Sequence, residues 1–285
     1  MSSTSRLREL LSTNKLISMP GCYDAMSARL IERAGFEATF MGGFAVSASR
    51  IGMPDTGLIS YTEMLDQGTN ICTAVSIPVI GDGDTGYGNA LNVQRTVRGY
   101  ARAGFACVMI EDQVAPKRCG HTRGKQTVDR AEARARIQAA VDAREAGNDI
   151  LVMARTDANA TEGFEEALER ARMFIDIGAD ITFLEAPTNE EQMRTYCAEV
   201  PGYKMANMVE QGDTPVLSPT ALQDIGYNIA IYPITLMLAG IRAMEQALAS
   251  LACGEVPPEA AEFAHLRDIV GFPDYYEAEK RYAAD

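Results

Sequence analysis

Basic residues are scarce in this sequence: 26 Lys and Arg stand against 39 Asp and Glu, for a formal net charge of −13. Nucleic acids and anionic membrane surfaces bind to clustered Lys and Arg, so we expect neither as a partner. The longest uncharged apolar stretch, about residues 229–241, contains a proline and is shorter than the ~20 residues of a membrane-spanning helix. The composition, 47% hydrophobic and 23% charged, is typical of a soluble globular protein.

Histidines and paired cysteines are also rare. The chain has two histidines, and its six cysteines include no C-x-x-C pair. This argues against a zinc site built from His and Cys and against a disulfide framework. The first residues, MSSTSRLRELLSTNK, are polar and charged, and no apolar signal segment follows them. We therefore expect a cytoplasmic protein with reduced thiols.

Eight short apolar runs recur along the chain, with amphipathic helical patterns between them. The runs are at 16–20, 38–42, 77–81, 106–110, 150–154, 181–185, 204–208 and 228–232. Continuous apolar strands that alternate with helices predict a parallel sheet buried on both faces. Eight such units favour a closed (β/α)₈ TIM-type barrel over an open doubly wound sheet, which stays an alternative. Because no linker interrupts the pattern, we predict a single domain over residues 1–285, including extra C-terminal helices.

Polar side chains gather directly after these runs. They are Asp82, Asp84, Glu111, Arg155, Glu185 and Asn207. In a barrel such positions converge on the carboxyl-terminal rim, where the active sites of this fold lie. We therefore treat the group as one site.

The acidic residues of this group predict a metal ion. Crowded carboxylates repel one another unless a cation neutralises them, and an oxygen-only set favours Mg²⁺, or Mn²⁺ in its place. The D-x-D spacing puts Asp82 and Asp84 on one side of an extended segment, with Glu111 and Asp55 on neighbouring turns. The alternative is that the Asp pair caps the following helix.

The segment K-R-C-G-H, Lys117 to His121, lies in a long polar insertion after the fourth run. Such a loop is too polar for the core and too long for a plain turn, which suggests a lid. Lys117, Arg118 and His121 would surround Cys119 with positive charge, which lowers a thiol pKa and prepares it for proton transfer or attack. Lys117, Cys119 and His121 are therefore candidate catalytic residues, although an isolated cysteine is more often structural.

Glycines at two places bear on ligand binding. Gly42 and Gly43 follow the second run and would allow the backbone to approach an anion closely. The stretch G-D-G-D-T-G-Y-G at 81–88 fits neither the dinucleotide fingerprint nor the Walker phosphate loop. No nucleotide site is predicted.

Three motifs together resemble the isocitrate lyase/phosphoenolpyruvate mutase superfamily. They are G-D-G-D-T-G-Y-G-N at 81–89, E-D-Q-V-A-P-K-R-C-G-H at 111–121 and M-A-R-T-D-A at 153–158. The likeness covers most of the chain, and K-R-C-G-H is similar to the carbon–carbon lyases rather than to the phosphonate mutases or oxaloacetate decarboxylases. The resemblance implies a Mg²⁺-dependent barrel whose last helix is swapped within a dimer, and two such dimers in a homotetramer.

The resemblance also assigns metal roles residue by residue. Asp82 would bind the metal directly. Asp55, Asp84 and Glu111 would hold its water ligands.

The implied reaction is retro-aldol cleavage of a substituted malate-type 2-hydroxydicarboxylate, such as 2,3-dimethylmalate, to a 2-oxoacid such as pyruvate plus a carboxylate. Arg155 would bind a substrate carboxylate and the oxyanion, Glu185 and Asn207 would line the pocket, and Cys119 would be the general acid. Cleavage of 2-methylisocitrate, hydrolysis of oxaloacetate and phosphonopyruvate-type activity are alternatives within the superfamily.

Two departures from the family pattern concern the expected substrate site. The pattern has a small hydroxyl residue, Gly, and then Gly or Tyr after the second strand, whereas this chain has Gly42, Gly43 and Phe44. The missing hydroxyls predict a roomier or less polar end of the site, and a barrel that binds without catalysing stays an alternative. Pro233 stands where the oxaloacetate hydrolases of the family tend to have Ser, which makes hydrolysis less expected.

Overall fold

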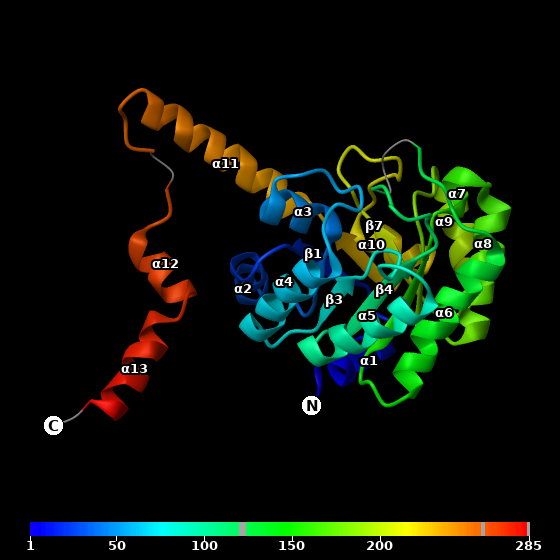
Figure 1. Ribbon diagram of the computed structural model, residues 1–285. Helices are drawn as coiled ribbons and strands as arrows, with labels where there is room; N and C mark the ends of the chain where they lie inside the picture. The colour runs from blue at the N-terminus through cyan, green and yellow to red at the C-terminus, as the bar shows by residue number, and fades with distance from the viewer. Residues whose placement is uncertain (120–123, 258–259, 284–285) are drawn as a thin grey trace. The chain divides into compact units, whose positions relative to one another are not determined.

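The computed structural model describes residues 1–119, 124–257 and 260–283. The chain divides into two compact units, residues 1–235 and 236–285, and each is described by itself. In the first unit, eight parallel strands close into a barrel in the order β1 to β8, surrounded by helices (Figure 1). The predicted (β/α)₈ barrel is confirmed, and the open-sheet alternative is wrong. The single-domain assignment stays a prediction.

Each predicted apolar run overlaps one strand. The strands are β1 (Ile17–Cys22), β2 (Thr39–Met41), β3 (Val79–Asp82), β4 (Cys107–Glu111), β5 (Leu151–Thr156), β6 (Ile181–Leu184), β7 (Tyr203–Asn207) and β8 (Ile229–Tyr232). The ring closes where β1 pairs with β8, with Ile17 opposite Ile229. Because all neighbours are parallel, every strand ends at the same rim of the barrel.

Helices precede or connect the strands and surround the barrel (Figure 1). They are α1 (Ser3–Ser12), α2 (Ala25–Arg33), α3 (Gly43–Ile51), α4 (Tyr61–Ala74), α5 (Ala90–Ala103), α6 (Arg130–Glu145), α7 (Ala158–Thr161), α8 (Phe164–Ile177), α9 (Glu190–Glu199) and α10 (Pro219–Ile225). Local sequence sets their ends: Ser60 and Glu63 form a capping box before α4. Gly104 and Gly178 end α5 and α8 with φ of 98° and 112°, a conformation that favours glycine.

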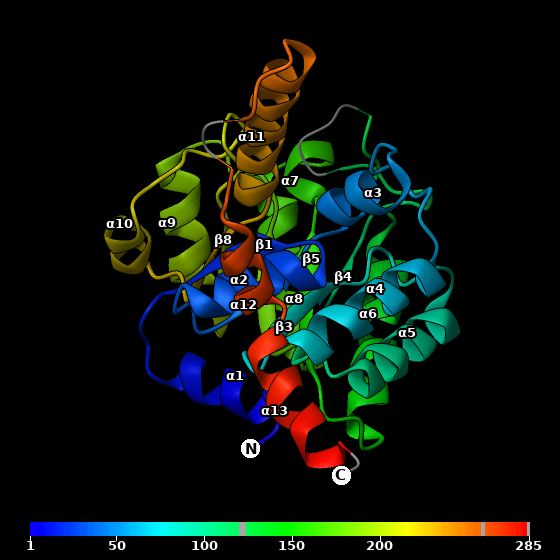
Figure 2. The same cartoon turned by 90° about the vertical axis from the view of Figure 1, so that its left-hand side faces the viewer.

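The barrel interior is apolar and closed at its amino-terminal end. Met19, Phe40 and Met153 belong to the interior cluster, and Leu7 and Leu11 of α1 join it from below (Figure 1). A second apolar layer packs α8, α9 and α10 against β6 to β8, and Figure 2 shows α9 and α10 side by side. Within the described residues, this packing leaves the carboxyl-terminal rim as the open end of the barrel.

The second unit consists of helical segments. Most of α11 (Thr235–Ala252) lies in it, followed by α12 (Phe263–Ile269) and α13 (Phe272–Tyr282). The guanidinium carbon of Arg267 lies 5.3 Å from the ring centre of Phe272 and 5.8 Å from that of Tyr276, which joins α12 to α13. The predicted extra C-terminal helices are present, whereas helix exchange between subunits stays a prediction. In the described parts of the chain, no helix combines the length and hydropathy needed to cross a bilayer.

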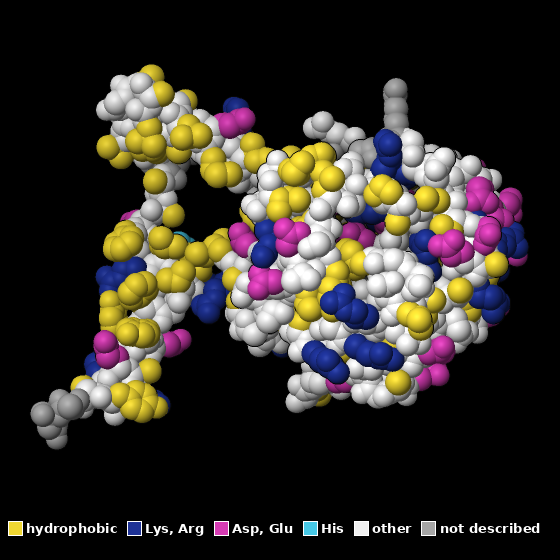
Figure 3. Space-filling model, viewed as in Figure 1, with side chains coloured by type: hydrophobic (Ala, Val, Ile, Leu, Met, Phe, Trp, Pro, Cys, Tyr) yellow, Lys and Arg dark blue, Asp and Glu magenta, His cyan; other side chains and the backbone are white. Residues whose placement is uncertain are grey.

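The acid excess is not spread evenly over the surface. Arg95, Arg98 and Arg102 lie along the exposed face of α5, and Figure 3 shows basic side chains gathered on that face. The guanidinium of Arg95 lies 4.2 Å from the ring centre of Tyr61. This face is locally basic although the chain as a whole is acidic.

Two glycines make room for an aromatic pair beneath the rim. The rings of Tyr100 and Phe105 stack with centres 4.6 Å apart. A Cβ added at Gly68 would lie 2.2 Å from Cζ of Phe105, and one added at Gly81 would lie 2.6 Å from its Cε1. Helix α4 and strand β3 can pack against this buried pair only because both positions lack a side chain.

We expect Gly68→Ala to lower the free energy of unfolding by roughly 1–3 kcal/mol, because a buried ring must move to admit the methyl group. Gly42→Ala is the matched control, since its Cβ would lie 3.7 Å from the nearest atom, Cε1 of Phe40. It should cost less than about 1 kcal/mol. Urea unfolding measures both, and equal losses would contradict the packing argument.

Candidate active site

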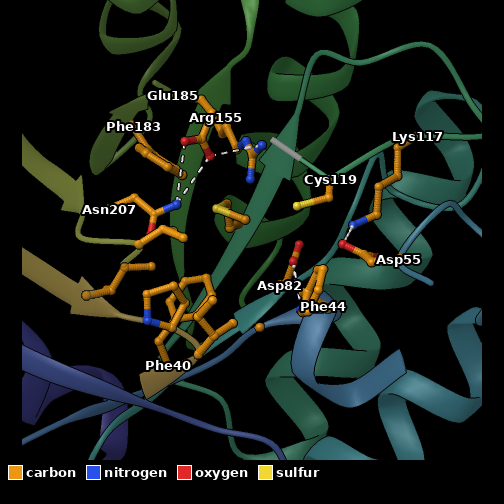
Figure 4. Close-up of a pocket in the computed structure, with 17 residues that line it drawn as sticks. Phe40, Phe44, Asp55, Asp82, Lys117, Cys119, Arg155, Phe183, Glu185 and Asn207 are labelled. Carbon is orange, nitrogen blue, oxygen red and sulfur yellow. Dashed lines mark hydrogen bonds and ion pairs between the residues drawn. The ribbon is translucent and has the colours of Figure 1, made fainter. Parts of the chain in front are cut away.

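A pocket of about 270 Å³ opens at the carboxyl-terminal rim (Figure 4). Most of the predicted site residues line it. They are Gly42, Gly43, Phe44, Asp55, Asp82, Lys117, Cys119, Arg155, Glu185, Asn207 and Pro233. Asp84 and Glu111 do not line the pocket, but they form ion pairs with lining residues, and His121 lies outside the described residues.

Asp82 ends β3 and is held by main-chain donors. Its Oδ2 accepts a hydrogen bond from the Gly43 N–H at 2.9 Å, and its Oδ1 accepts one from the Asp84 N–H at 3.0 Å. A Cβ at Gly43 would lie 2.9 Å from the same Oδ2. The sequence predicts that the backbone at Gly43 approaches an anion closely. In the structure that anion is the protein's own Asp82 carboxylate, which faces the first turn of α3.

Lys117 lies among the acidic side chains. Its Nζ is 2.7 Å from Oδ2 of Asp55 and 2.9 Å from Oδ1 of Asp84, and all three side chains are buried. Burial alone would lower the pKa of Lys117, but the charges of Asp84, Asp82 and Asp55 raise it well above its usual value. Lys117 thus neutralises part of the crowded negative charge.

Lys117 does not fully compensate the negative charge of these buried carboxylates. Burial raises the pKa of Asp84 to about 6 in spite of Lys117, and Asp82 adds to the rise. Burial also raises the pKa of Glu111 well above its usual value. Oδ1 of Asp55 and Oε1 of Glu111 are buried and accept no hydrogen bond within the described residues.

These atoms suit a hard cation better than a soft one. The described residues contain no group of three or more His, Cys, Asp or Glu arranged to enclose a metal by themselves. A site that takes one carboxylate directly and completes its shell with water is typical of Mg²⁺. The carboxylate of Asp82, which lines the pocket, and the unpartnered oxygens of Asp55 and Glu111 fit that kind of site.

Arg155 is the penultimate residue of β5 and is fixed on two of its three nitrogens. Its Nε and Nη2 donate to the two carboxylate oxygens of Asp157 at 2.8 and 3.0 Å. Nη2 also lies 3.0 Å from Glu185, and Nε lies 3.3 Å from Glu111. Nη1 has no partner among the described residues, and Arg155 lines the pocket. The guanidinium therefore offers one free edge to a ligand.

Glu185 and Asn207 form the wall beside Arg155 (Figure 4). Nδ2 of Asn207 is 3.5 Å from both carboxylate oxygens of Glu185, and Oε1 of Glu185 accepts a hydrogen bond from the Ala186 N–H at 3.0 Å. Glu185 directly follows β6 and Asn207 ends β7, so both side chains reach the pocket from neighbouring strand ends. This is the position that the sequence predicted for them.

The thiol of Cys119 points into the pocket between Arg155 and Asp82 (Figure 4). The charge of Lys117 is shared with two carboxylates, and the Arg118 main chain is bonded to the Gln113 side chain. The positive field predicted around Cys119 is therefore partly compensated on the Lys117 side. Lowering of the Cys119 pKa stays a prediction.

The side of the pocket near β2 and β8 is apolar. Its lining side chains there are Phe40, Phe44, Ile231, Pro233 and Ile234. Gly42 adds no side chain to this wall, and a Cβ there would meet only the ring of Phe40, at 3.7 Å. The pocket thus has a charged half, from β3 to β7, and an apolar half.

Four charged residues that contact the site without lining the pocket have no role predicted from the sequence: Asp112, Asp157, Lys125 and Arg170. Asp112 directly follows Glu111, and Asp157 stands two positions after Arg155, so the available signal is a further acid behind a predicted site residue. Lys125 reaches Asp157 with 3.3 Å between Nζ and Oδ1. Arg170 lies within a charge-rich helical stretch and gave no signal.

Residues 7–252 match the family described as phosphoenolpyruvate phosphomutase. The chain belongs to this family. It is 44% identical to the 2,3-dimethylmalate lyase of Eubacterium barkeri over 99% of both chains. It is 41% identical to the 2-methylisocitrate lyase of Aeropyrum pernix, over 97% of this chain and 89% of that one.

Solved structures agree with the family. An oxaloacetate acetylhydrolase in complex with 3,3-difluorooxalacetate superposes with a TM-score of 0.96 at 35% identity, over 100% of this chain and 98% of the other. The superfamily predicted from the three motifs is confirmed, and so are the predictions that the chain is an enzyme and that it is a carbon–carbon lyase.

The raised pKa of Asp84 makes the stability of the metal-free protein depend on pH. The folded protein keeps the Asp84 proton up to about pH 6, whereas the usual value is 3.8. Raising the pH between these values therefore favours the unfolded chain, by roughly 2–3 kcal/mol in total. This loss of stability is absent below about pH 4 and complete above about pH 6.

We expect Asp84→Asn to remove this penalty. In EDTA, the stability of the variant relative to the wild type should rise between about pH 4 and pH 7. Urea unfolding across this range measures the difference. A difference that is constant with pH would contradict the raised pKa.

Proposed function

We propose that this enzyme cleaves the C2–C3 bond of a malate that carries a substituent on C3, giving a 2-oxoacid and a second carboxylate. The observation that carries the proposal is the meeting of Cys119, Asp82 and Arg155 in one pocket. Together they offer an acid, a metal-binding carboxylate and an anion-binding guanidinium. A retro-aldol cleavage needs all three.

Mg²⁺ is the proposed cofactor, with Mn²⁺ as the alternative ion for the same oxygen set. Asp82 would hold it directly, and Asp55, Asp84 and Glu111 would hold its water ligands. When bound, the ion would polarise the 2-hydroxyl and C1 carboxylate of the substrate and lower the pKa of the hydroxyl. Lys117 would stay paired with Asp55 and Asp84 and balance their charge.

Arg155 would bind a substrate carboxylate through Nη1 and stabilise negative charge on the C2 oxygen. Because Asp157 and Glu185 hold the other nitrogens, the guanidinium is oriented before the substrate arrives. Such preorganised donors lower the barrier without reorganisation during the reaction. Glu185 and Asn207 would line the substrate beside it.

Cys119 is the proposed general acid. Loss of the hydroxyl proton to water lets the C2–C3 bond break, so that C2 becomes the carbonyl carbon of the 2-oxoacid and C3 keeps the electron pair. The Cys119 thiol then gives its proton to C3 and regains one before the next turnover. Lys117 and His121 are proposed to assist from the same segment.

The apolar half of the pocket supports an alkyl substituent on C3. Phe44 and Pro233 would contact it, with Gly42 and Gly43 leaving room. The third carboxylate of 2-methylisocitrate would meet this apolar wall, and Pro233 has no hydroxyl to offer an oxaloacetate hydrolysis. A 2,3-dimethylmalate-like substrate is therefore preferred, and those two reactions and phosphonopyruvate-type activity remain the alternatives.

Assembly and location are also proposals. We propose a cytoplasmic homotetramer made of two helix-swapped dimers. The support is the C-terminal helices that follow the barrel and six cysteines of which none forms a disulfide among the described residues.

The reaction is tested by measuring pyruvate release from 2,3-dimethylmalate and 2-methylisocitrate, oxalate release from oxaloacetate, and glyoxylate release from isocitrate. We expect EDTA-sensitive turnover of 2,3-dimethylmalate and a loss of about 10²–10⁴-fold in kcat for Cys119→Ser, because the general acid is removed. Cys253→Ser, at an exposed cysteine, should leave kcat unchanged. Full activity of Cys119→Ser would rule out this assignment.

The metal assignment is tested by calorimetry with Mg²⁺ alone. Asp82→Asn should weaken Mg²⁺ binding by a factor of about ten or more, since the ion loses its direct protein carboxylate. Asp66→Asn is the control, because Asp66 is exposed and pairs with Arg50 at 2.6 Å away from the pocket. Equal affinities for the wild type and Asp82→Asn would refute the assignment.

A further inference from the structure

An arginine from outside the barrel reaches the carboxyl end of β5. Arg170 of α8 is 1% exposed, and its Nη1 lies 3.0 Å from Oδ2 of Asp112. The same Oδ2 accepts a hydrogen bond from the Thr156 hydroxyl at 2.7 Å, and Oδ1 accepts the Asp157 N–H at 2.9 Å. Asp112 therefore ties Arg170 to the two residues that follow Arg155.

The connection continues from Asp157 into the pocket. The Asp157 side chain is fully buried and binds Arg155 through both carboxylate oxygens, at 2.8 and 3.0 Å. Rotation of the 156–157 main chain would carry that carboxylate away from the guanidinium. Asp112 is therefore one of the groups that hold Asp157, and through it Arg155, in place; Lys125 also contacts Asp157, at 3.3 Å.

Asp112 depends on Arg170 in turn. Asp112 is 2% exposed, and burial together with the nearby Asp157 charge raises its pKa. Without Arg170 it would be an uncompensated buried carboxylate, which protonates or turns away. Arg170 also pairs with two glutamates: its Nη2 lies 2.7 Å from Oε1 of Glu162, and its Nε lies 2.8 Å from Oε1 of Glu166.

We propose that Asp112 and Arg170 are positioning residues for Arg155, and that they set its direction through Thr156 and Asp157. Neither residue lines the pocket. The inference rests on the proposed function only in taking Arg155 as the group that binds the substrate carboxylate.

The opposite end of β5 provides a matched control. There Arg144 of α6 donates to Oδ2 of Asp180 at 2.6 Å, and the same oxygen accepts the Val152 N–H at 2.9 Å. This pair has a similar construction, an outer arginine and an aspartate that accepts a main-chain N–H near one end of β5, although Asp180 also pairs with Arg8 at 3.3 Å. It lies at the amino-terminal end of the barrel, away from the pocket.

The test compares Arg170→Met, Arg170→Lys and Arg144→Met. We expect Arg170→Met to lower kcat/KM for 2,3-dimethylmalate by about 10²-fold, the effect of a misplacement near 1 Å. Oxalate binding in the presence of Mg²⁺, measured by calorimetry, should weaken about tenfold, since a charged hydrogen bond is misdirected. Arg170→Lys should recover part of both losses.

Arg144→Met should lower the urea midpoint, as Arg170→Met does, but change oxalate affinity and kcat/KM by less than about threefold. Equal functional losses in Arg144→Met and Arg170→Met would show a merely structural role and overturn the proposal. A loss confined to the urea midpoint in Arg170→Met would overturn it as well.

If Arg170→Met does not fold, Thr156→Val gives the same contrast, because it removes the hydroxyl bond to Asp112. Its control is Thr182→Val on β6, whose hydroxyl lies 2.8 Å from the Tyr196 hydroxyl. We expect weaker oxalate binding in Thr156→Val only, and equal effects of the two would overturn the proposal.

The oxalate measurement separates this proposal from the proposed function. A wild type that turns over no malate, with the oxalate contrast intact, would refute the reaction and support the positioning role. A wild type that binds no oxalate would overturn the anion site at Arg155 and the positioning role with it.

Discussion

The convergence of buried carboxylates on one rim of the barrel is the constraint on which the site depends. Asp82 and Asp84 come from the end of β3, Glu111 from the end of β4 and Asp55 from the segment after α3, and all four are buried at this rim. Like charges so placed are tolerated only when cations or N–H groups face them. Lys117 compensates part of this negative charge. The raised pKa values of Asp84 and Glu111 show that the rest is not compensated within the protein. The remaining negative charge makes the rim suitable for a divalent cation.

On the other side of the site the arrangement is reversed: a single guanidinium is surrounded by carboxylates. Arg155 is surrounded by Asp157, Glu185 and Glu111, so most of its donors are used within the protein. A guanidinium held in this way has little freedom, and its remaining edge is directed at the pocket. Burying these charges costs desolvation free energy, which is offset because each charge has a partner of opposite sign nearby. The ion pairs beneath the rim are therefore part of how the site is oriented.

Much of the fold and site could be predicted from local sequence. The eight apolar runs gave all eight strands because a parallel barrel strand is buried on both faces, and such strands are continuously apolar. The acids at strand ends were found because parallel strands share one rim. Gly43 was expected to approach an anion, but the identity of that anion, the Asp82 carboxylate, required the pairing of β2 beside β3.

What the sequence by itself determined is the barrel, the rim that carries the chemistry and the superfamily, because each follows from periodicity or from contiguous motifs. Only the tertiary structure decided how the charges pair. Lys117 faces Asp55 and Asp84, across 62 and 33 positions of sequence, rather than serving Cys119 alone. Arg170 reaches Asp112 from a helix outside the barrel. Such pairings follow from distances between separate strand ends and helices, and electrostatic energy depends on those distances and on burial, which no local pattern encodes.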